Sequence, residues 1–357
     1  MIDEILKENE RRRSELLREY DPVRGDSQDP MRAKVKAPDG EWCYVPVDML
    51  RMHKEEEFSD MTPEEFDKLR CLHDFPYWAA TRCYITRKGG GEDILFRLNY
   101  PQRKLLKVLE NMRREMQPIR LILLKARQWG GSTCAQLYMA WLQLMHKPGL
   151  NSLIVAHQHS ATYEIRDMFV KMIERYEDKP AGKGADENEK RGERRFESAG
   201  PGTIRVKRGN FKVKVASAER PDSCRGGDYS LVHCSEVALW KKTKRRTPED
   251  MLRAATSGVL LEPFTMIVLE STANGCDNFF HSEYKSAKKG KSQFVPLFIA
   301  WFEIEQYMLP FKPGEREEFA ERLWKFGNQE DASSDREQPG RYLRWLWEKG
   351  ATLESIH

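Results

Sequence analysis

The sequence predicts an α/β fold, in which helices cover both faces of a mostly parallel sheet. Residues 119–124 form an almost unbroken apolar run, which is typical of a strand that is buried on both faces. Two adjacent glycines, Gly130 and Gly131, follow this run, and a stretch with helical spacing of apolar residues begins directly after them. Further apolar strands alternate with helices along the chain. A strand, a glycine turn and a helix, followed by more strands, indicate a doubly wound core.

The elements of this core follow in chain order from the spacing of apolar side chains. A helix precedes the first strand, because Leu105, Leu106, Val108 and Leu109 provide an apolar face for it. We expect helices at 101–116, 132–145 and 161–176, and strands at 119–124, 152–156, 203–206, 211–215, 230–234 and 265–269.

The chain divides by composition into three expected segments. Residues 1–74 are rich in charge and poor in long apolar runs, so we expect a partly helical N-terminal appendage. Within it, Thr62 and Pro63 with the acidic residues after them give the signature of a helix start. Residues 75–300 contain the alternating strands and helices of the core. Residues 301–357 are aromatic and charged, and we expect them to form a small C-terminal lid.

Composition and charge exclude several classes of protein. The 357 residues include 60 Lys and Arg and 56 Asp and Glu, so the formal net charge is only +4. No window approaches the ~18 apolar residues of a membrane span, and the first residues lack the apolar stretch of a signal peptide. We therefore expect a protein that stays inside the cell without a membrane partner. The seven cysteines include no Cys-x-x-Cys pair, which argues against a disulfide framework and a cysteine zinc site.

The turn after the first core strand has the residue types of a phosphate-binding loop. It reads Lys125-Ala126-Arg127-Gln128-Trp129-Gly130-Gly131-Ser132-Thr133. Such a loop needs small residues whose backbone N–H groups face the phosphates, a helix N-terminus, a cation and a hydroxyl for magnesium. The usual G-x-x-x-x-G-K-[ST] pattern has its lysine where this chain has Gly131, and Lys125 stands at the place of the first glycine. We expect Lys125 to reach the same phosphates and Ser132 to bind magnesium; an ordinary Gly-Gly turn is the alternative.

Two further strands end in polar residues that suit nucleotide chemistry. The strand at 230–234 leads into Ser235 and Glu236, close to the hhhhDE pattern but with serine in place of the aspartate. Because a carboxylate at the C-terminal end of a parallel strand faces the ligand crevice, Glu236 is a candidate general base; a surface acid is the alternative. Ser235 can hold magnesium only through its hydroxyl or through a water. The strand at 265–269 runs into hydroxyl and amide residues suited to sensing a γ-phosphate, which are Ser271, Thr272 and Asn274.

Four segments of the chain form a more specific pattern when they are taken together. They are LLKARQWGGST, RGGDYSLVHCSEVALW, VLESTANG and PLFIAWFEIEQY. In this order they resemble the large terminase subunit of tailed bacteriophages, the ATPase that packages genomic DNA into the procapsid, over roughly residues 75–307. The resemblance implies a P-loop NTPase fold of the ASCE type, with ATP and Mg²⁺ as its ligands.

The same resemblance implies roles for the residues around the phosphates. Arg127 stands where terminases place an arginine that acts in cis on the γ-phosphate, a task that suits a rigid guanidinium. Lys125 matches the lysine of a Walker A motif that is shifted to the start of the loop. Ser132 matches the magnesium ligand, and Glu236 matches the catalytic acid of Walker B. Ser235 departs from the commonest pattern, which leaves direct ligation of magnesium at that position open.

Two other sets of residues also match functional elements of the family. Ser271, Thr272 and Asn274 match the coupling motif, which links hydrolysis to subdomain movement. Tyr100 and Gln102 resemble an element upstream of the loop that reads adenine, where a ring can stack and an amide can pair with the edge of the base.

The resemblance implies a motor that couples hydrolysis of Mg-ATP to translocation of double-stranded DNA into a procapsid. Its partners would be DNA, the portal protein and the small terminase subunit, at the portal vertex in the cytoplasm of the host bacterium. It would act as a homo-oligomeric ring on the portal, with a monomer in solution as the alternative. Large terminases also carry a two-metal nuclease domain; because the chain ends at His357, we expect no DNA cutting from it.

Two other functions stay open at this point. One is another nucleic-acid-dependent P-loop ATPase, such as a helicase. The other is a nucleotide-binding scaffold protein with little turnover, which the departures at Gly131 and Ser235 would suit.

Overall fold

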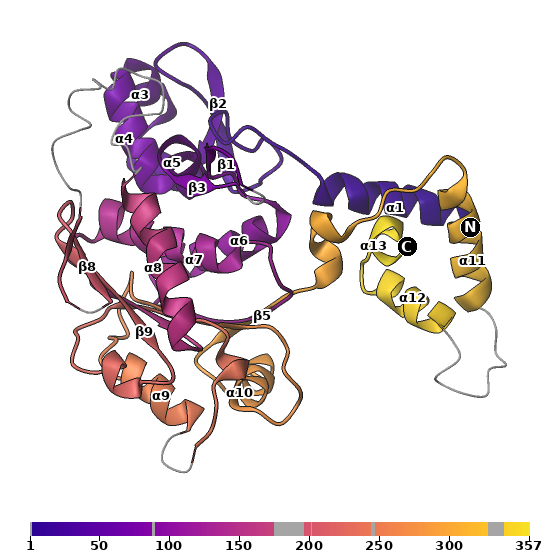
Figure 1. The fold of residues 1–357 in the computed structure, drawn as a ribbon. Coiled ribbons are helices and arrows are strands. Elements are labelled where there is room, and N and C mark those ends of the chain that lie inside the picture. Colours follow the sequence, from indigo (N-terminus) through magenta and orange to yellow (C-terminus); the bar gives the residue numbers. More distant parts are fainter. Residues whose placement is uncertain (1, 88–89, 175–195, 201, 244–246, 328–338) are drawn as a thin grey trace. The chain divides into compact units, whose positions relative to one another are not determined.

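The chain folds into two compact units, each assembled from distant parts of the sequence. The computed structural model describes residues 2–87, 90–174, 196–200, 202–243, 247–327 and 339–357. The helical unit consists of Met1–Glu19, Lys125–Trp129 and Ile299–His357 (Figure 1). The sheet unit consists of Tyr20–Leu124 and Gly130–Phe298.

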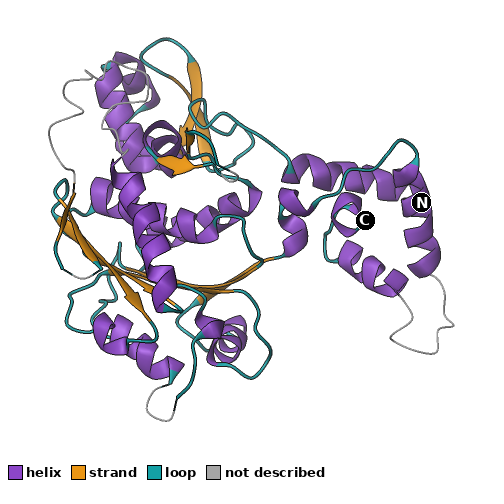
Figure 2. Cartoon of the chain, in the orientation of Figure 1, coloured by secondary structure: helices purple, strands orange, loops and turns teal. Residues whose placement is uncertain are grey.

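A mostly parallel sheet forms the centre of the sheet unit. In the described part of the chain its strands are β5 (Ile119–Lys125), β6 (Ser152–Ala156), β7 (Phe196–Ser198), β8 (Thr203–Val206), β9 (Phe211–Ser217), β10 (Leu231–Cys234), β11 (Met266–Ser271) and β12 (Val295–Ile299). They lie in the order β12-β5-β11-β10-β6-β9-β8-β7. Figure 2 shows the strands in orange, between purple helices. The run from β5 to β9 is parallel throughout, and β8 and β7 are added antiparallel at one edge.

The order of three central strands defines the class of the fold. β11 lies between β5 and β10, with Leu124 of β5 opposite Ser271 and Cys234 of β10 opposite Leu269. Because the three strands are parallel, their C-terminal ends meet at one edge of the sheet. Along the chain these strands alternate with helices, as in an α/β fold. The predicted fold class is therefore confirmed.

Helices cover both faces of this sheet (Figure 1). The face above the sheet in that view carries α6 (Tyr100–Arg114), α7 (Gly131–Trp141) and α8 (His159–Glu174). The opposite face carries α9 (Pro248–Thr256) and α10 (Phe279–Lys288). Two cover layers explain why the central strands are apolar along their whole length.

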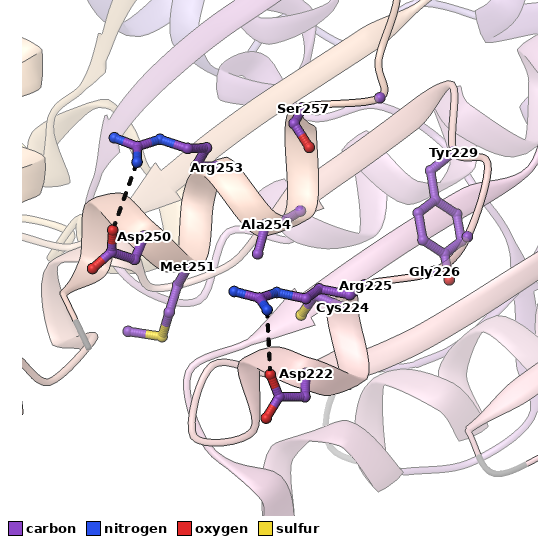
Figure 3. Close-up of a pocket in the computed structure, with 13 residues that line it drawn as sticks. Asp222, Cys224, Arg225, Gly226, Tyr229, Asp250, Met251, Arg253, Ala254 and Ser257 are labelled. Atoms are coloured by element: carbon purple, nitrogen blue, oxygen red, sulfur yellow. Dashed lines mark ion pairs between the residues drawn. The ribbon is translucent and has the colours of Figure 1, made fainter. Parts of the chain in front are cut away.

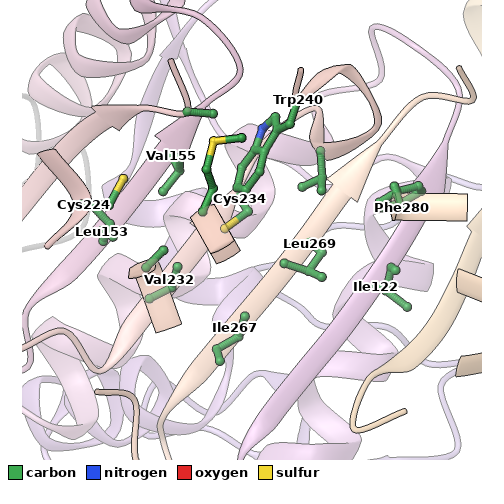
Figure 4. Packing of buried hydrophobic residues seen from close by; sticks show 14 of the residues in the cluster. Ile122, Leu153, Val155, Cys224, Val232, Cys234, Trp240, Ile267, Leu269 and Phe280 are labelled. Carbon is green, nitrogen blue, oxygen red and sulfur yellow. The ribbon is translucent and has the colours of Figure 1, made fainter. Parts of the chain in front are cut away.

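The core beneath α9 and α10 is continuous across the central strands (Figure 4). It includes Ile122 of β5, Leu269 of β11, Val232 of β10 and Val155 of β6, with Phe280 of α10 packed on them. Each of these side chains is at most 2% exposed. Burying one side chain of this size contributes about 1.5–3 kcal/mol, so the core holds the strand ends in fixed register.

The N-terminal part of the sheet unit adds small elements to this core. They are the paired strands β1 (Arg32–Lys36) and β2 (Trp42–Pro46), the helices α2 (Val47–Met52), α3 (Glu55–Asp60), α4 (Pro63–His73) and α5 (Phe75–Arg82), and the paired strands β3 (Tyr84–Thr86) and β4 (Asp93–Leu95). The predicted helix start at Thr62 is confirmed as a capping box. The Thr62 Oγ1 atom accepts from the Glu65 N–H at 3.3 Å, and Glu65 Oε2 accepts from the Thr62 N–H at 2.9 Å.

Asp74 joins several of these elements. It ends α4 and caps α5, and its buried carboxylate accepts two hydrogen bonds from Arg32 at 2.7 and 2.8 Å and one from Arg70 at 3.3 Å. Burial alone would raise the pKa of Asp74, but the charges of Arg32 and Arg70 and their hydrogen bonds hold the pKa below its usual value of 3.8. This ion cluster ties the β1–β2 pair to α4 and α5.

The helical unit has a core of its own. It contains α1 (Ile2–Leu16), the short 3₁₀ turns η5 (Trp301–Glu303) and η6 (Glu305–Tyr307), α11 (Glu315–Gly327), α12 (Pro339–Glu348) and α13 (Leu353–Ile356). Ile5 of α1 packs with Phe319, Leu323, Leu346 and Leu353 from the C-terminal helices. Apolar burial therefore holds the first helix of the chain against the last three.

A buried polar pair adds to this packing. Asn9 Nδ2 donates to Glu354 Oε2 at 3.0 Å, and Asn9 Oδ1 accepts from the Leu353 N–H at 2.7 Å. Arg316 forms an ion pair with the same carboxylate at 2.8 Å. Asn9 is thus bonded to both the backbone and a side chain of α13.

The two units do not coincide with the three segments expected from composition. Residues 2–19 group with the C-terminal helices, whereas residues 20–74 belong to the sheet unit. The helix expected at 132–145 also differs, because α7 ends at Trp141 and the chain continues as one π-helical turn, Leu142–His146. The remaining short turns are η3 (Pro221–Cys224) and η4 (Val237–Leu239).

Two further features of the described residues concern their helices and their cysteines. None of their helices combines the length and apolarity needed to cross a membrane. All seven cysteines are free thiols, six of them buried and Cys276 exposed.

Candidate nucleotide site

The glycine turn has a backbone conformation that needs glycine. Gly130 has a φ of 77° and caps α7, which begins at Gly131. A Cβ atom at Gly130 would lie 2.7 Å from Nε2 of Gln102. Both the left-handed φ and this close approach exclude a larger residue without rearrangement. The first N–H groups of α7 therefore start directly at the turn, as anion binding requires.

Gln102 supports this turn from α6. Its Nε2 donates to the Gly130 carbonyl at 3.2 Å, and its Oε1 accepts from the Asn99 N–H at 3.0 Å. Asn99 Oδ1 accepts from the Gln102 N–H in return, which completes a capping box at the start of α6. The side-chain amide of Gln102 thus bonds within the protein, on the turn itself. Adenine reading by Gln102 and by its half-buried neighbour Tyr100 stays a prediction.

The residues before the turn belong to the helical unit and are held by their own contacts. The indole N–H of Trp129 donates to the Ala126 carbonyl at 3.1 Å, and Tyr307 Oη donates to the Arg127 carbonyl at 3.0 Å. Trp129 is 2% exposed, so its ring is part of the packing and only its backbone can face a ligand. Gln128 has a left-handed φ of 65°. Lys125 ends β5, and its expected role, like that of Arg127, stays a prediction.

Glu236 and the residues after β11 are brought together at the edge of the sheet. Glu236 follows β10 by two residues and has a left-handed φ of 51°. Its Oε2 accepts from the Thr272 N–H and the Thr272 hydroxyl, both at 3.1 Å, and from the Ser271 hydroxyl at 3.3 Å. A non-glycine residue in this conformation is uncommon, and such strain concentrates at functional sites. The candidate acid and two of the candidate coupling residues therefore form one hydrogen-bonded group.

Asn274 extends this group to the turn after Glu236. Asn274 Nδ2 donates to the Ala238 carbonyl at 2.9 Å, and the Ala238 N–H donates to the Ser271 hydroxyl at 3.1 Å. All three candidate coupling residues thus bond to the segment 236–238. A movement of the chain after β11 would be transmitted to Glu236 through these bonds.

Glu270 is a site residue that the sequence analysis did not select. It is 1% exposed, and its Oε1 accepts from the Ser132 hydroxyl at 2.5 Å and from the Ser235 hydroxyl at 3.0 Å. The Nε2 atom of the buried His233 lies 3.3 Å from the same oxygen. The two serines expected to bind magnesium therefore meet on one carboxylate. The sequence feature that could have identified Glu270 is an acidic residue at the end of an apolar strand, at the same edge of the sheet as Glu236.

A separate cavity lies elsewhere in the sheet unit (Figure 3). It has a volume of about 650 Å³ and is lined by most residues of the segments 222–229 and 250–258. Arg225 pairs with Asp222 at 3.8 Å and Arg253 with Asp250 at 3.9 Å, and all four side chains are exposed. None of the predicted nucleotide-site residues lines this cavity.

The strand order and the parallel pairing of the central strands define an α/β fold with a mostly parallel central sheet. No protein-family model matches the chain, and no curated protein matches it. Among solved structures, the chain is similar to the large terminase of bacteriophage HK97, with 13% identity and a TM-score of 0.48, over 83% of this chain and 55% of that one. The chain thus spans about half the length of that terminase.

Two further structures are similar to this chain. The ATPase domain of the Thermus phage P74-26 large terminase has 17% identity and a TM-score of 0.36, over 62% of this chain and 91% of that one. The large terminase of another thermophilic bacteriophage, solved in complex with ADP, has 15% identity and a TM-score of 0.39, over 62% of this chain and 49% of that one. These are the proteins that the sequence motifs resemble.

Proposed function

We propose that the chain is an ATPase whose hydrolysis of Mg-ATP drives double-stranded DNA into a viral procapsid. The observation that carries the proposal is the placement of Glu236, hydrogen bonded to Ser271 and Thr272 at the C-terminal edge of the sheet. A carboxylate held in this way can orient a water and accept its proton as that water attacks a γ-phosphate.

The glycine turn supplies the phosphate site in this proposal. Backbone N–H groups at the start of α7 would face the phosphates, with Lys125 and Arg127 as the cations. Ser132 and Ser235 would provide oxygens for Mg²⁺, and the ring of Tyr100 would stack on adenine. The hydrogen bond from Gln102 to Gly130 gives Gln102 a further task, which is to hold the shape of the turn.

ATP hydrolysis by four proteins tests the site. They are the wild type, Lys125→Ala, Glu236→Gln and, as a matched control, Glu249→Gln at an exposed position of α9. We expect Glu236→Gln to lower kcat by about 10²–10⁴-fold with little change in nucleotide affinity, because glutamine keeps the size and shape of the side chain but cannot act as the base. Lys125→Ala should weaken ATP binding, and the control should behave as the wild type. Equal hydrolysis by all four folded proteins would overturn the site assignment.

Translocation is tested separately from hydrolysis. A duplex translocase displaces a third strand bound to the duplex without separating the two strands beneath it, whereas a helicase separates them. We expect DNA to stimulate ATP hydrolysis, with a stimulation that falls as salt rises, because grip on the phosphate backbone is electrostatic. Strand separation would favour the helicase alternative, and ATP binding without turnover would favour the scaffold.

The proposed partners follow from the same function. The motor would sit on the portal protein as a homo-oligomeric ring, at the portal vertex in the host cytoplasm, and receive DNA from the small terminase subunit. Binding of the purified chain to portal rings, with its stoichiometry, tests this part. Absence of portal binding by an active, DNA-stimulated ATPase would contradict the packaging role alone.

A further inference from the structure

Two hydroxyl groups and one buried carboxylate converge at the edge of the sheet. Ser132 lies in the first turn of α7, Ser235 follows β10, and Glu270 is the last residue but one of β11. Both hydroxyls donate to the same oxygen, Glu270 Oε1, at 2.5 and 3.0 Å. The three side chains come from three separate elements, so the cluster exists only in the folded chain.

The strand order accounts for this convergence. β11 lies between β5, which leads into the glycine turn, and β10, which leads into Ser235. Glu270 lies opposite Leu123 of β5, one residue before the end of the pairing, and so reaches the edge where both neighbours end. An acidic side chain at this point of β11 faces both the phosphate turn and the end of β10.

The chemistry of the cluster fits a hard divalent cation. All three side chains offer oxygen, and Mg²⁺ in phosphate sites is held by oxygen ligands that include one or two carboxylates. Ser235 brings no charge to the position where the hhhhDE pattern has aspartate. The Nε2 atom of His233 also lies 3.3 Å from Glu270 Oε1. Within the described ranges no group of three or more His, Cys, Asp or Glu side chains could hold a metal, so a softer metal lacks a full set of its usual ligands.

We propose that Glu270 supplies the carboxylate of the magnesium site, in the place of the aspartate that is serine at position 235. The inference rests on the proposed nucleotide site. Glu270 bears the charge that balances the cation, and the hydroxyls of Ser132 and Ser235, now bonded to it, are the neutral oxygens beside it. Compared with the hhhhDE pattern, the carboxylate of this site is thus supplied by the adjacent strand β11 and not by the end of β10.

Binding of ADP, measured by calorimetry in magnesium and in EDTA, tests the proposal without using hydrolysis. The wild type should bind more tightly in magnesium than in EDTA. We expect Glu270→Gln to bind ADP in EDTA as the wild type does and to weaken the magnesium-dependent gain by about 10–100-fold. Glu249→Gln serves as the matched control and should keep the full gain, since Glu249 is exposed on α9 and is not part of the cluster.

A rescue variant makes the test specific. Adding Ser235→Asp to Glu270→Gln returns a carboxylate to the β10 position and should restore most of the magnesium-dependent gain. If Glu270→Gln does not fold, Glu270→Asp replaces it, because the shorter side chain keeps the charge but withdraws it from both hydroxyls. The same loss and the same rescue are then expected.

The outcomes separate this inference from the proposed function. A folded Glu270→Gln protein with an undiminished magnesium-dependent gain overturns the inference and leaves the ATPase proposal intact. A lost gain that Ser235→Asp does not restore assigns Glu270 a structural role and also overturns it. A wild type that binds no nucleotide in either buffer overturns the proposed function, and the inference with it.

Discussion

Thr272 holds the carboxylate of Glu236 with two hydrogen bonds, one from its backbone N–H and one from its hydroxyl, both at 3.1 Å. The bonds link the residue after β11 to the acid after β10. They give the proposed coupling motif a structural basis, because the position of the Glu236 carboxylate depends on the position of the segment that follows β11.

Replacing Thr272 by valine removes the hydroxyl bond and keeps the amide bond. A hydrogen bond to a charged group contributes about 1.5–3 kcal/mol, so a less well-held Glu236 should lower kcat by about tenfold or more. Steady-state kinetics and nucleotide binding measure the two effects separately. Thr272→Ser keeps both bonds and should retain the wild-type rate; a change in affinity as large as the change in kcat would contradict a role in holding the acid.

The glycine turn makes a prediction about stability. Gly130→Ala places a Cβ atom in a left-handed conformation and 2.7 Å from Nε2 of Gln102. The conformation alone costs about 1–2 kcal/mol, and the contact adds to it. Denaturant unfolding should show that Gly130→Ala lowers the free energy of unfolding by more than this range. Adding Gln102→Ala removes the contact and should bring the loss back toward about 1–2 kcal/mol. No recovery in the double variant would show that the contact with Gln102 does not contribute.

Asp74 predicts a pH-dependent loss of stability. Asp74→Asn removes the buried charged partner of Arg32 and leaves it only the half-exposed Asp29 at 3.6 Å. Breaking such a buried pair costs about 3–5 kcal/mol near pH 7. The pKa of Asp74 is lower in the folded chain than its usual value of 3.8. Its stabilising contribution is therefore present above that value and is lost as the pH falls through the lowered folded value.

Unfolding by urea at several pH values measures this effect. The wild type and Asp74→Asn should differ most at neutral pH and converge in acid. Asp29→Asn is the matched control, because Asp29 pairs with the same Arg32 at 3.6 Å but is half exposed. It should cost less than about 1 kcal/mol. A constant difference between wild type and Asp74→Asn at every pH would contradict the assignment.

The hydrogen bonds of Asn9 lead to a prediction about how α1 is held in the helical unit. Asn9→Ala removes the hydrogen bond from the Leu353 N–H and the hydrogen bond to Glu354. Leaving a buried group without its partner lowers the free energy of unfolding by about 1–3 kcal/mol. Amide hydrogen exchange of residues 2–16 should become faster, whereas the exposed neighbour change Glu10→Ala should leave it unchanged. Equal exchange in both variants would show that the apolar contacts of Ile5 suffice to hold the helix.

Much of the fold was predictable from residue spacing. β6 and β8 lie at the expected residues 152–156 and 203–206, because short apolar runs between polar residues can form few other buried structures. The capping box at Thr62 was predictable as well, since it depends on residues three apart. The strand β7 was not predicted, because it has only three residues, and the β1–β2 pair was not predicted, because it lies in a charged segment without a long apolar run.

The sequence by itself determined which residues stand at strand ends. Periodicity locates buried strands, and parallel strands end at one edge, so the glycine turn, Glu236 and Thr272 could be grouped from local pattern alone. Only the tertiary structure decided that Glu270 joins Ser132 to Ser235, because this depends on β11 lying between β5 and β10. The packing of α1 with the last helices is equally non-local. The order of strands in a sheet and the packing of distant segments produce no periodic pattern in the sequence, so neither could be predicted from it.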